Sequence, residues 1–352
     1  MVCKVFYIED LDPESRIETL KSDSFKIVSF KPDVNIDDII QKIIDENPDI
    51  ILMDYKLTEG SELSYCDAPT IASTLRSKYN NAIKERPIVL ISTLDNIVKL
   101  YKKDYTSHDL FDYAISKERA LENTEYFRCK CLSFLNSYTD IVKNKFDLDK
   151  ILGLNGEINL IHSKIRIQLN KDIQSAYEFS RFIFEHLIRC SGLLIGEDIL
   201  SARLGVSKDS TDWGKLKEKL LEYKYIGIFS DVYDRWWMSK IEFWWNDILK
   251  IDYPLRQYDV TERVLLLQKQ LGLNDLNEVK SSSMNLSKNY WSICKETQLP
   301  LDPFDGIELL DEEYKPWQDK EYVSIEGALQ NLEKYSKIIS ESDKRELRKY
   351  NK

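Results

Sequence analysis

Five short apolar runs alternate with longer helix-like stretches over the first 117 residues, and this alternation constrains the fold more than any other feature. The third run, residues 50–53, is uniformly apolar, which is typical of a strand buried on both faces of a parallel sheet. Residues 36–47 carry apolar side chains at the 3-4 spacing of an amphipathic helix. The pattern predicts an α/β domain with a five-stranded parallel sheet, helices on both faces and right-handed crossovers. The runs are residues 5–8, 25–30, 50–53, 87–91 and 111–115.

Polar residues follow four of these runs. Because the carboxyl ends of parallel strands lie at one edge of a sheet, where open α/β sheets build their sites, these side chains are expected to converge. They are Glu9, Asp10, Asp54, Ser92, Thr93 and Lys117. Taken singly, each can be an ordinary polar loop residue. Their combination at several strand ends favours a functional site.

The chemistry that this set favours is acyl-phosphate formation on Asp54. A carboxylate that attacks a phosphoryl group needs its charge neutralised first. Glu9, Asp10 and Asp54 would repel one another unless a divalent cation bound among them, and Mg²⁺ prefers a few carboxylate or carbonyl oxygens. Lys117 can pair with phosphoryl oxygens. The Ser92 hydroxyl can donate to the same group, which would pull the loop after the fourth strand into a second position.

Residues 1–125 resemble the receiver domain of two-component response regulators, which has a flavodoxin-like fold. The resemblance rests on IED at the first strand end, DIILMDYKL at the third, PIVLIST at the fourth and YAISK at the fifth. It implies Mg²⁺ as cofactor and a phosphohistidine on a partner histidine kinase or phosphotransfer protein as phosphoryl donor. It also implies these roles: Asp54 as phosphoacceptor, Glu9 and Asp10 as the acidic pair for Mg²⁺, the Lys56 backbone carbonyl as a further ligand, Ser92 as the switch hydroxyl and Lys117 as the paired lysine.

The sequence departs from the receiver pattern at two positions near the fifth strand. Glu118 follows the lysine where receivers usually have proline, and Tyr113 lies one residue further from the lysine than the usual aromatic switch position. Both departures concern the face formed by the fourth helix and fifth strand, where receivers usually dimerise. The core chemistry is unaffected.

Composition excludes several classes of function. No apolar run approaches the roughly 20 residues that cross a bilayer, and the acidic N-terminus does not read as a signal peptide, so a cytoplasmic protein without membrane contact is expected. A net charge of −10 argues against broad nucleic-acid binding. The six cysteines form no CxxC pair, and Cys129 and Cys131 have no close histidine, which favours reduced, mostly buried thiols over a zinc site.

A long helix over residues 118–144 is expected to lead into a mainly helical C-terminal region. Residues 172–190 predict an amphipathic helix. Residues 193–229 have the outline of a winged helix-turn-helix, with a second helix at 211–223 and a strand at 225–229. The helix at 211–223 mixes lysines with acidic residues, so protein docking is favoured over DNA binding.

Four tryptophans lie within ten residues, at positions 236, 237, 244 and 245. Trp237 and Trp244 are seven residues apart, the spacing of one helix face, and two readings are open: a buried seam or a hot spot for a partner. Residues 290–327 predict a compact irregular module with short strands or turns. Cys294 has no histidine near it in sequence, which disfavours a nucleophilic enzyme there.

The expected domain organisation is a receiver at 1–125, a connecting helix at 118–146, a helical domain at 147–280 and a small module with a tail at 281–352. The leading hypothesis is a non-enzymatic response-regulator-like protein that switches a C-terminal partner-docking domain. The alternatives are a DNA-binding transcriptional regulator, a phosphate sink without output, and a degenerate receiver kept as a structural module in a bacterial defence or stress complex.

Overall fold

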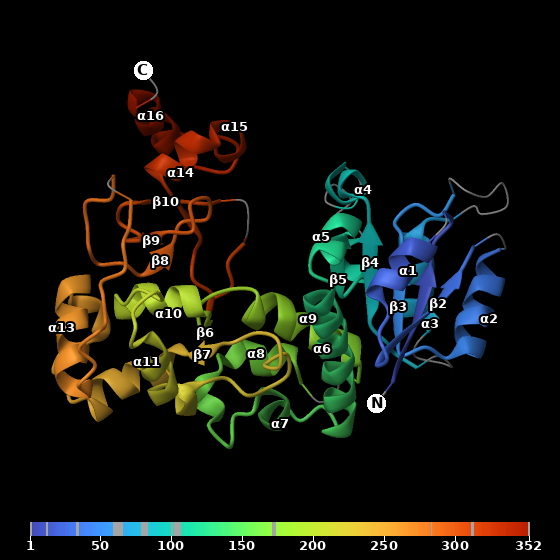
Figure 1. Cartoon of the computed structure of the whole chain (residues 1–352), viewed down its shortest axis with the longest axis horizontal. Coiled ribbons are helices and arrows are strands. Elements are labelled where there is room, and N and C mark those ends of the chain that lie inside the picture. The colour runs from blue at the N-terminus through green and yellow to red at the C-terminus, as the bar shows by residue number, and fades with distance from the viewer. Residues whose placement is uncertain are drawn as a thin grey trace. The chain divides into compact units, whose positions relative to one another are not determined.

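The computed structural model describes residues 2–11, 13–32, 35–58, 66–78, 84–99, 101, 107–170, 174–282, 284–310 and 313–350. The chain divides into two compact units (Figure 1). The first comprises Met1–Ile151 and Leu169–Phe182, and the second Leu152–Gln168 and Ile183–Lys352. The predicted four-part division of the chain stays a prediction.

The first unit contains a five-stranded sheet of order β2-β1-β3-β4-β5, in which every pairing is parallel. This confirms the predicted α/β, flavodoxin-like sheet. The third strand is uniformly apolar and the fourth is apolar up to Ser92, and both are buried along their whole length, as a central parallel strand requires. The bounds are β1 Cys3–Ile8, β2 Phe25–Phe30, β3 Ile50–Met53, β4 Ile88–Ser92 and β5 Tyr113–Ser116.

Helices cover both faces of this sheet (Figure 1). On one face, α2, α3 and α4 pack their apolar side chains against the strands in one core. On the other, α1, α5 and α6 form a second core. The helices are α1 Glu14–Leu20, α2 Ile36–Glu46, α3 Ala68–Lys78, α4 Leu94–Lys99, α5 Lys117–Glu122 and α6 Thr124–Lys143.

The predicted continuous helix over residues 118–144 is wrong in one respect, because it is interrupted at Asn123. This residue has φ −139° and ψ 73°, outside the helical region, and its side chain accepts a hydrogen bond from the Tyr126 backbone N–H at 3.1 Å. Asn123 therefore ends α5 and caps α6.

A buried carboxylate, Asp112, organises the amino-terminal edge of the sheet just before β5. Its Oδ2 accepts from Arg76 Nη2 at 2.7 Å and from the Ile88 backbone N–H at 2.8 Å. Its Oδ1 accepts from the Tyr138 hydroxyl at 2.7 Å. Asp112 thereby joins α3, β4 and α6, and both of its oxygens are satisfied.

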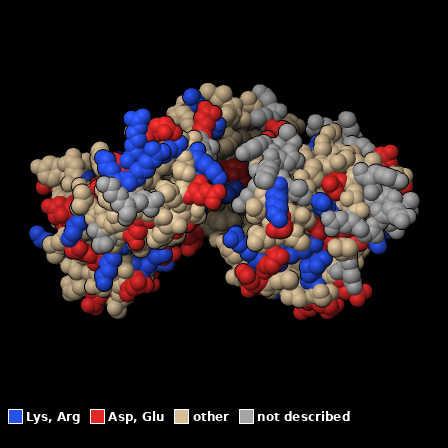
Figure 2. All heavy atoms as spheres, turned by 90° about the horizontal axis from the view of Figure 1, so that it is seen from above, with Lys and Arg blue, Asp and Glu red and all other residues tan. Residues whose placement is uncertain are grey.

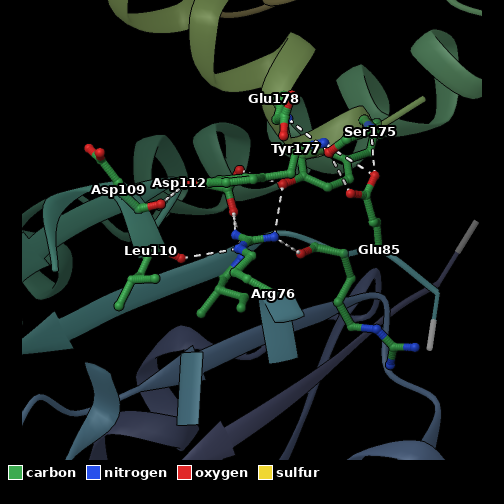
Figure 3. A network of polar contacts seen from close by, with 12 residues as sticks. Arg76, Glu85, Asp109, Leu110, Asp112, Ser175, Tyr177 and Glu178 are labelled. Carbon is green, nitrogen blue, oxygen red and sulfur yellow. Dashed lines mark hydrogen bonds and ion pairs between the residues drawn. The ribbon is translucent and has the colours of Figure 1, made fainter. Parts of the chain in front are cut away.

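The same edge holds the start of α9, Ala176–Ile183 (Figure 3). Glu85 accepts from the Ser175 hydroxyl at 2.6 Å and from the backbone N–H groups of Ala176 and Tyr177, so it caps this helix from a distant part of the chain. The Tyr177 ring lies 3.6 Å from the Arg76 guanidinium carbon, a cation–π contact. The predicted amphipathic helix at 172–190 thus begins at the amino-terminal edge of the sheet.

The second unit is largely helical, and α9 continues into it through a π-helical turn, Phe184–Ile188. A second π-helical turn, Trp244–Ile248, extends α12. The remaining helices are α7 Leu148–Leu152 at the boundary of the units, α8 Ser163–Gln168, α10 Glu197–Leu204, α11 Trp213–Lys219, α12 Met238–Phe243 and α13 Val260–Leu271.

Short extended segments around α10 and α11 have part of the predicted winged-helix outline. β6, Leu194–Ile195, pairs antiparallel with β7, Trp236–Trp237, and Lys224 bridges to Trp236. The predicted strand at 225–229 is wrong, because residues after Tyr225 turn instead of extending. The predicted helix at 211–223 ends at Lys219 and is followed by a short 3₁₀ turn, Leu221–Tyr223. A winged helix stays a prediction here.

All four clustered tryptophans are buried, each exposing 2% or less of its surface. This confirms that the four side chains are buried and leaves no exposed tryptophan hot spot at these positions. The expectation that Trp237 and Trp244 share a helix face was wrong, because Trp236 and Trp237 form β7 while Trp244 and Trp245 lie in the π-helical turn. Extended backbone places successive side chains on opposite sides, so both members of a pair can be buried only inside a core.

The C-terminal part of the second unit has its own small core. It is built from two-stranded pairs and short helices, as the predicted irregular module implied. No described helix is long and apolar enough to cross a membrane. Every cysteine is free, with Cys3, Cys131 and Cys294 buried and the other three half-buried. The elements are β8 Ser292–Ile293, β9 Pro300–Leu301, β10 Gly306–Glu308, β11 Tyr322–Ser324, α14 Ile325–Gln330, α15 Leu332–Tyr335 and α16 Glu341–Tyr350.

Candidate metal and phosphoryl site

The strand register brings the predicted residues to one edge of the sheet. Ile8 of β1 is paired with Met53 of β3, so the acidic residues that follow each strand become neighbours. The Asp54 backbone N–H donates to the Ile8 carbonyl at 3.0 Å, which fixes this proximity. Ser92 is paired with Ser116 of β5, so Lys117 follows directly beside Ser92.

Three carboxylates form the floor of the site. Glu9, Asp10 and Asp54 expose 1%, 3% and 4% of their surfaces, and a ligand oxygen of each lies within 4.8 Å of the others. Buried carboxylates at this spacing repel one another, and a small cation with oxygen ligands relieves that repulsion. Glu9 Oε1 is buried, and no described donor reaches it. The donor set and this unsatisfied oxygen therefore fit Mg²⁺.

Asp54 is surrounded by donors even without a metal. Its Oδ1 accepts from the Tyr55 backbone N–H at 2.6 Å and from the Ser92 hydroxyl. Its Oδ2 pairs with the Lys117 ammonium group, which also lies 2.8 Å from Glu9 Oε2. A hydroxyl and an ammonium group thus contact the oxygens on which a phosphoryl group would be carried.

The remaining predicted residues occupy less central places. Thr93 is exposed, and its hydroxyl accepts from the Asn96 backbone N–H at 3.2 Å, so it caps α4 instead of facing the carboxylates. The Asn96 side chain lies 3.3 Å from the Ser92 hydroxyl, which ties the first turn of α4 to the site. Lys56, whose carbonyl was predicted as a ligand, is half-buried two residues after Asp54.

Two residues that sequence reasoning missed hold Glu9. The Tyr7 hydroxyl donates to Glu9 Oε2 at 2.8 Å, and Arg16 Nη2 on α1 donates to the same oxygen at 2.7 Å. The contact of Tyr7 with Glu9 could have been predicted, because residues two apart in a strand point to the same face of the sheet. No such signal existed for Arg16, because whether its side chain reaches Glu9 depends on where α1 begins.

Burial and the neighbouring carboxylate set the protonation of these two groups. Burial first, and then the charge of Glu9, raises the pKa of the Tyr7 phenol far above its ordinary value. Burial by itself would lower the pKa of the Arg16 guanidinium group. The interactions with Tyr7 and Glu9 raise this pKa by more, so the net effect is a raised pKa. Tyr7 therefore stays a neutral donor and Arg16 a permanent cation beside the carboxylates.

No family model matches the chain, and a search of curated proteins gives no match either. Among solved structures, the chain is similar to the BeF3-activated receiver domain of Klebsiella pneumoniae RstA, at 24% identity over 32% of this chain and 85% of that one, with a TM-score of 0.24. It is also similar to the response regulator domain of Thermotoga maritima CheB, at 16% identity over 39% and 98% of the two chains, with a TM-score of 0.29.

A third similar structure is a DNA-binding response regulator of the LuxR family from Staphylococcus aureus, at 18% identity over 35% of this chain and 94% of that one, with a TM-score of 0.27. The likenesses cover about a third of the chain. The parallel sheet of order β2-β1-β3-β4-β5 with helices on both faces gives the N-terminal unit a flavodoxin-like fold. The acidic pair follows β1 and Asp54 follows β3 in this fold.

Proposed function

We propose that this chain is a response-regulator-like signalling protein that accepts a phosphoryl group on Asp54 and changes the docking properties of its C-terminal unit. The observation that carries the proposal is the joint contact of Ser92 and Lys117 with the two carboxylate oxygens of Asp54. A purely structural aspartate would need hydrogen-bond partners for its two oxygens. It would not need further buried carboxylates next to it.

In the proposed reaction, an oxygen of Asp54 attacks the phosphorus of a phosphohistidine on a partner histidine kinase or phosphotransfer protein. The new O–P bond forms as the P–N bond breaks, and the imidazole nitrogen leaves with the bonding electron pair and takes up a proton. The Lys117 ammonium group neutralises the phosphoryl oxygens, and Glu9, Asp10, Asp54 and the Lys56 carbonyl would hold Mg²⁺. The metal supplies positive charge to the transferring group.

Ser92 provides the proposed switch. Its hydroxyl now donates to Asp54, and it also contacts Asn96 of α4. Donation to a phosphoryl oxygen instead would move Ser92 and pull on the first turn of α4. This is a two-state loop whose equilibrium the modification shifts.

The charge pattern around α11 supports protein docking as the output over DNA binding. Lys215 and Lys217 each pair with an acidic side chain at 2.7 Å, Asp212 and Glu197 respectively. Lys208 is likewise paired with Asp198. Figure 2 shows Lys and Arg beside Asp and Glu across the face it presents. Lysines held by local carboxylates are poor phosphate ligands, so a DNA-reading α11 is disfavoured.

Two experiments test the proposal. Incubation of the full chain with Mg²⁺ and acetyl phosphate is expected to add one phosphoryl mass to the wild type and none to Asp54→Asn. Equal masses in the two proteins would leave the degenerate, purely structural receiver as the better account. Titration with duplex DNA at graded salt is expected to show no sequence preference, whereas specific binding with a steep salt dependence would favour a transcriptional regulator.

A further inference from the structure

Three donors converge on a single oxygen of Glu9. Tyr7, Arg16 and Lys117 all approach Oε2, at 2.8, 2.7 and 2.8 Å, while Oε1 has no described donor. The Glu9 side chain is fully buried, and the Arg16 side chain exposes 19% of its surface. The donors therefore turn Oε2 toward the protein and leave Oε1 as the oxygen available for another positive group.

Arg16 changes the charge balance of the site. The site holds three buried carboxylates, and the Lys117 ammonium group contacts two of them, Glu9 and Asp54. Arg16 adds a further cation that is fixed by its ion pair with Glu9. A divalent cation that enters this site therefore meets one unit of negative charge less than it would without Arg16.

We propose that Arg16 is a positioning residue that weakens the affinity of the site for free Mg²⁺ and strengthens its affinity for a phosphoryl group. This inference rests on the proposed function and identifies a residue that tunes it. Arg16 fixes the Glu9 carboxylate through Oε2, and its positive charge repels a cation but attracts the extra negative charge that arrives with phosphorylation. Its effect is to make metal binding depend on the phosphoryl group.

The Coulomb law gives the sign and a lower bound for the size of the effect. Even when screened by the dielectric constant of bulk water, a fixed positive charge about 6 to 13 Å from a divalent cation changes metal affinity by about 3- to 10-fold. Removing Arg16 should tighten Mg²⁺ binding by that factor. The same change should weaken the binding of a phosphoryl mimic. A purely structural Arg16 would move both affinities in the same direction or neither.

The test uses the full-length chain, with Mg²⁺ measured by isothermal titration calorimetry, Mn²⁺ by electron paramagnetic resonance, and BeF₃⁻ at saturating Mg²⁺ by ¹⁹F NMR. Arg16→Gln is compared with the wild type, and Tyr7→Phe removes a donor to Glu9 without removing charge. Lys21→Gln is the matched control, because it removes a surface cation just after α1 that is paired only with Glu18 among the described residues.

Arg16→Gln is expected to bind Mg²⁺ about 3- to 10-fold more tightly and BeF₃⁻ more weakly, with smaller changes for Tyr7→Phe and none for Lys21→Gln. Unchanged or weaker metal binding by Arg16→Gln, with a wild type that does bind, would overturn this inference and leave the proposed function standing. Absence of metal binding in both proteins would overturn both. Circular dichroism of each variant establishes that the fold is retained.

Discussion

The five-stranded sheet has a buried aspartate at each edge, Asp112 and Asp54, and the two are held in opposite ways. At the amino-terminal edge, Asp112 is matched by one arginine, one backbone N–H and one tyrosine hydroxyl, which together satisfy both oxygens. At the carboxyl edge, Asp54 shares Lys117 with Glu9, and Asp10 adds a third carboxylate. One edge is balanced in charge and the other carries a surplus.

This difference separates a structural carboxylate from a functional one. A buried carboxylate whose two oxygens are both hydrogen-bonded presents no unsatisfied oxygen to a ligand, and removing it leaves its buried cationic partner uncompensated. A buried cluster with excess negative charge and an unsatisfied oxygen gains energy when a cation enters. The comparison therefore predicts that substitutions at the amino-terminal edge change stability, whereas those at the carboxyl edge change ligand binding.

The largest effect is expected for Asp112→Ala. This change leaves Arg76, whose side chain exposes only 9%, without its carboxylate, and loss of one partner of a buried pair costs about 3–5 kcal/mol. Urea denaturation followed by far-UV circular dichroism measures it. Asp109→Ala is the control, since it breaks an exposed pair with Arg181 and should cost under about 1 kcal/mol. Equal losses in the two variants would contradict a special role for Asp112.

Magnesium is expected to stabilise the receiver through the carboxyl edge alone. At ten times its dissociation constant, a ligand that binds only the folded state adds about 1.4 kcal/mol to the free energy of unfolding. Hydrogen exchange of peptides from β3 and β4 should show this increase in the wild type and a much smaller one in Asp54→Asn. An equal increase in both proteins would place the metal elsewhere.

Glu85→Gln should weaken the cap that the receiver provides to α9. Three donors from residues 175–177 converge on its carboxylate, and replacing a charged acceptor at a helix N-terminus costs about 1 kcal/mol. Faster amide exchange at Ala176–Ile183 is the expected readout. Glu178→Gln is the matched control, because it lies in the first turn of the same helix and provides no such cap. Identical amide exchange rates in the two variants would contradict the capping of α9 by Glu85.

Asp54→Asn is expected to have the smallest effect on stability. Removing one charge from the surplus relieves repulsion, and Lys117 keeps its contact with Glu9, so the free energy of unfolding without Mg²⁺ should change by less than about 1 kcal/mol. Urea denaturation in the presence of a chelator measures this. A loss as large as that of Asp112→Ala would show that the two edges are alike.

Local sequence patterns predicted the side-chain contacts at the carboxyl edge of the sheet, but not those at the amino-terminal edge. Glu9, Asp54 and Lys117 each follow a strand directly and Ser92 ends one, so period and sheet geometry are enough to bring them together. Arg76 meets Tyr177 only because distant segments fold onto the same edge, and neither residue stands in a recognisable pattern. The sequence therefore reveals contacts set by strand ends and hides those set by tertiary packing.

The errors have the same origin. The break at Asn123 depends on a side chain that caps α6, which competes with helix continuation. The tryptophan pairs were assigned to one helix from spacing alone, but Trp236 and Trp237 belong to a strand that a partner strand stabilises. Spacing indicates which side chains share a face only after the type of element is known.

The most direct test of the account is the location of the phosphoryl group. The full chain is treated with acetyl phosphate and Mg²⁺ and then with borohydride, which reduces an aspartyl phosphate to homoserine, and its peptides are sequenced by mass spectrometry. The account predicts homoserine at position 54 in the wild type and none at Asp112. Modification at another carboxylate, or at none under conditions where Mg²⁺ binds, would contradict it.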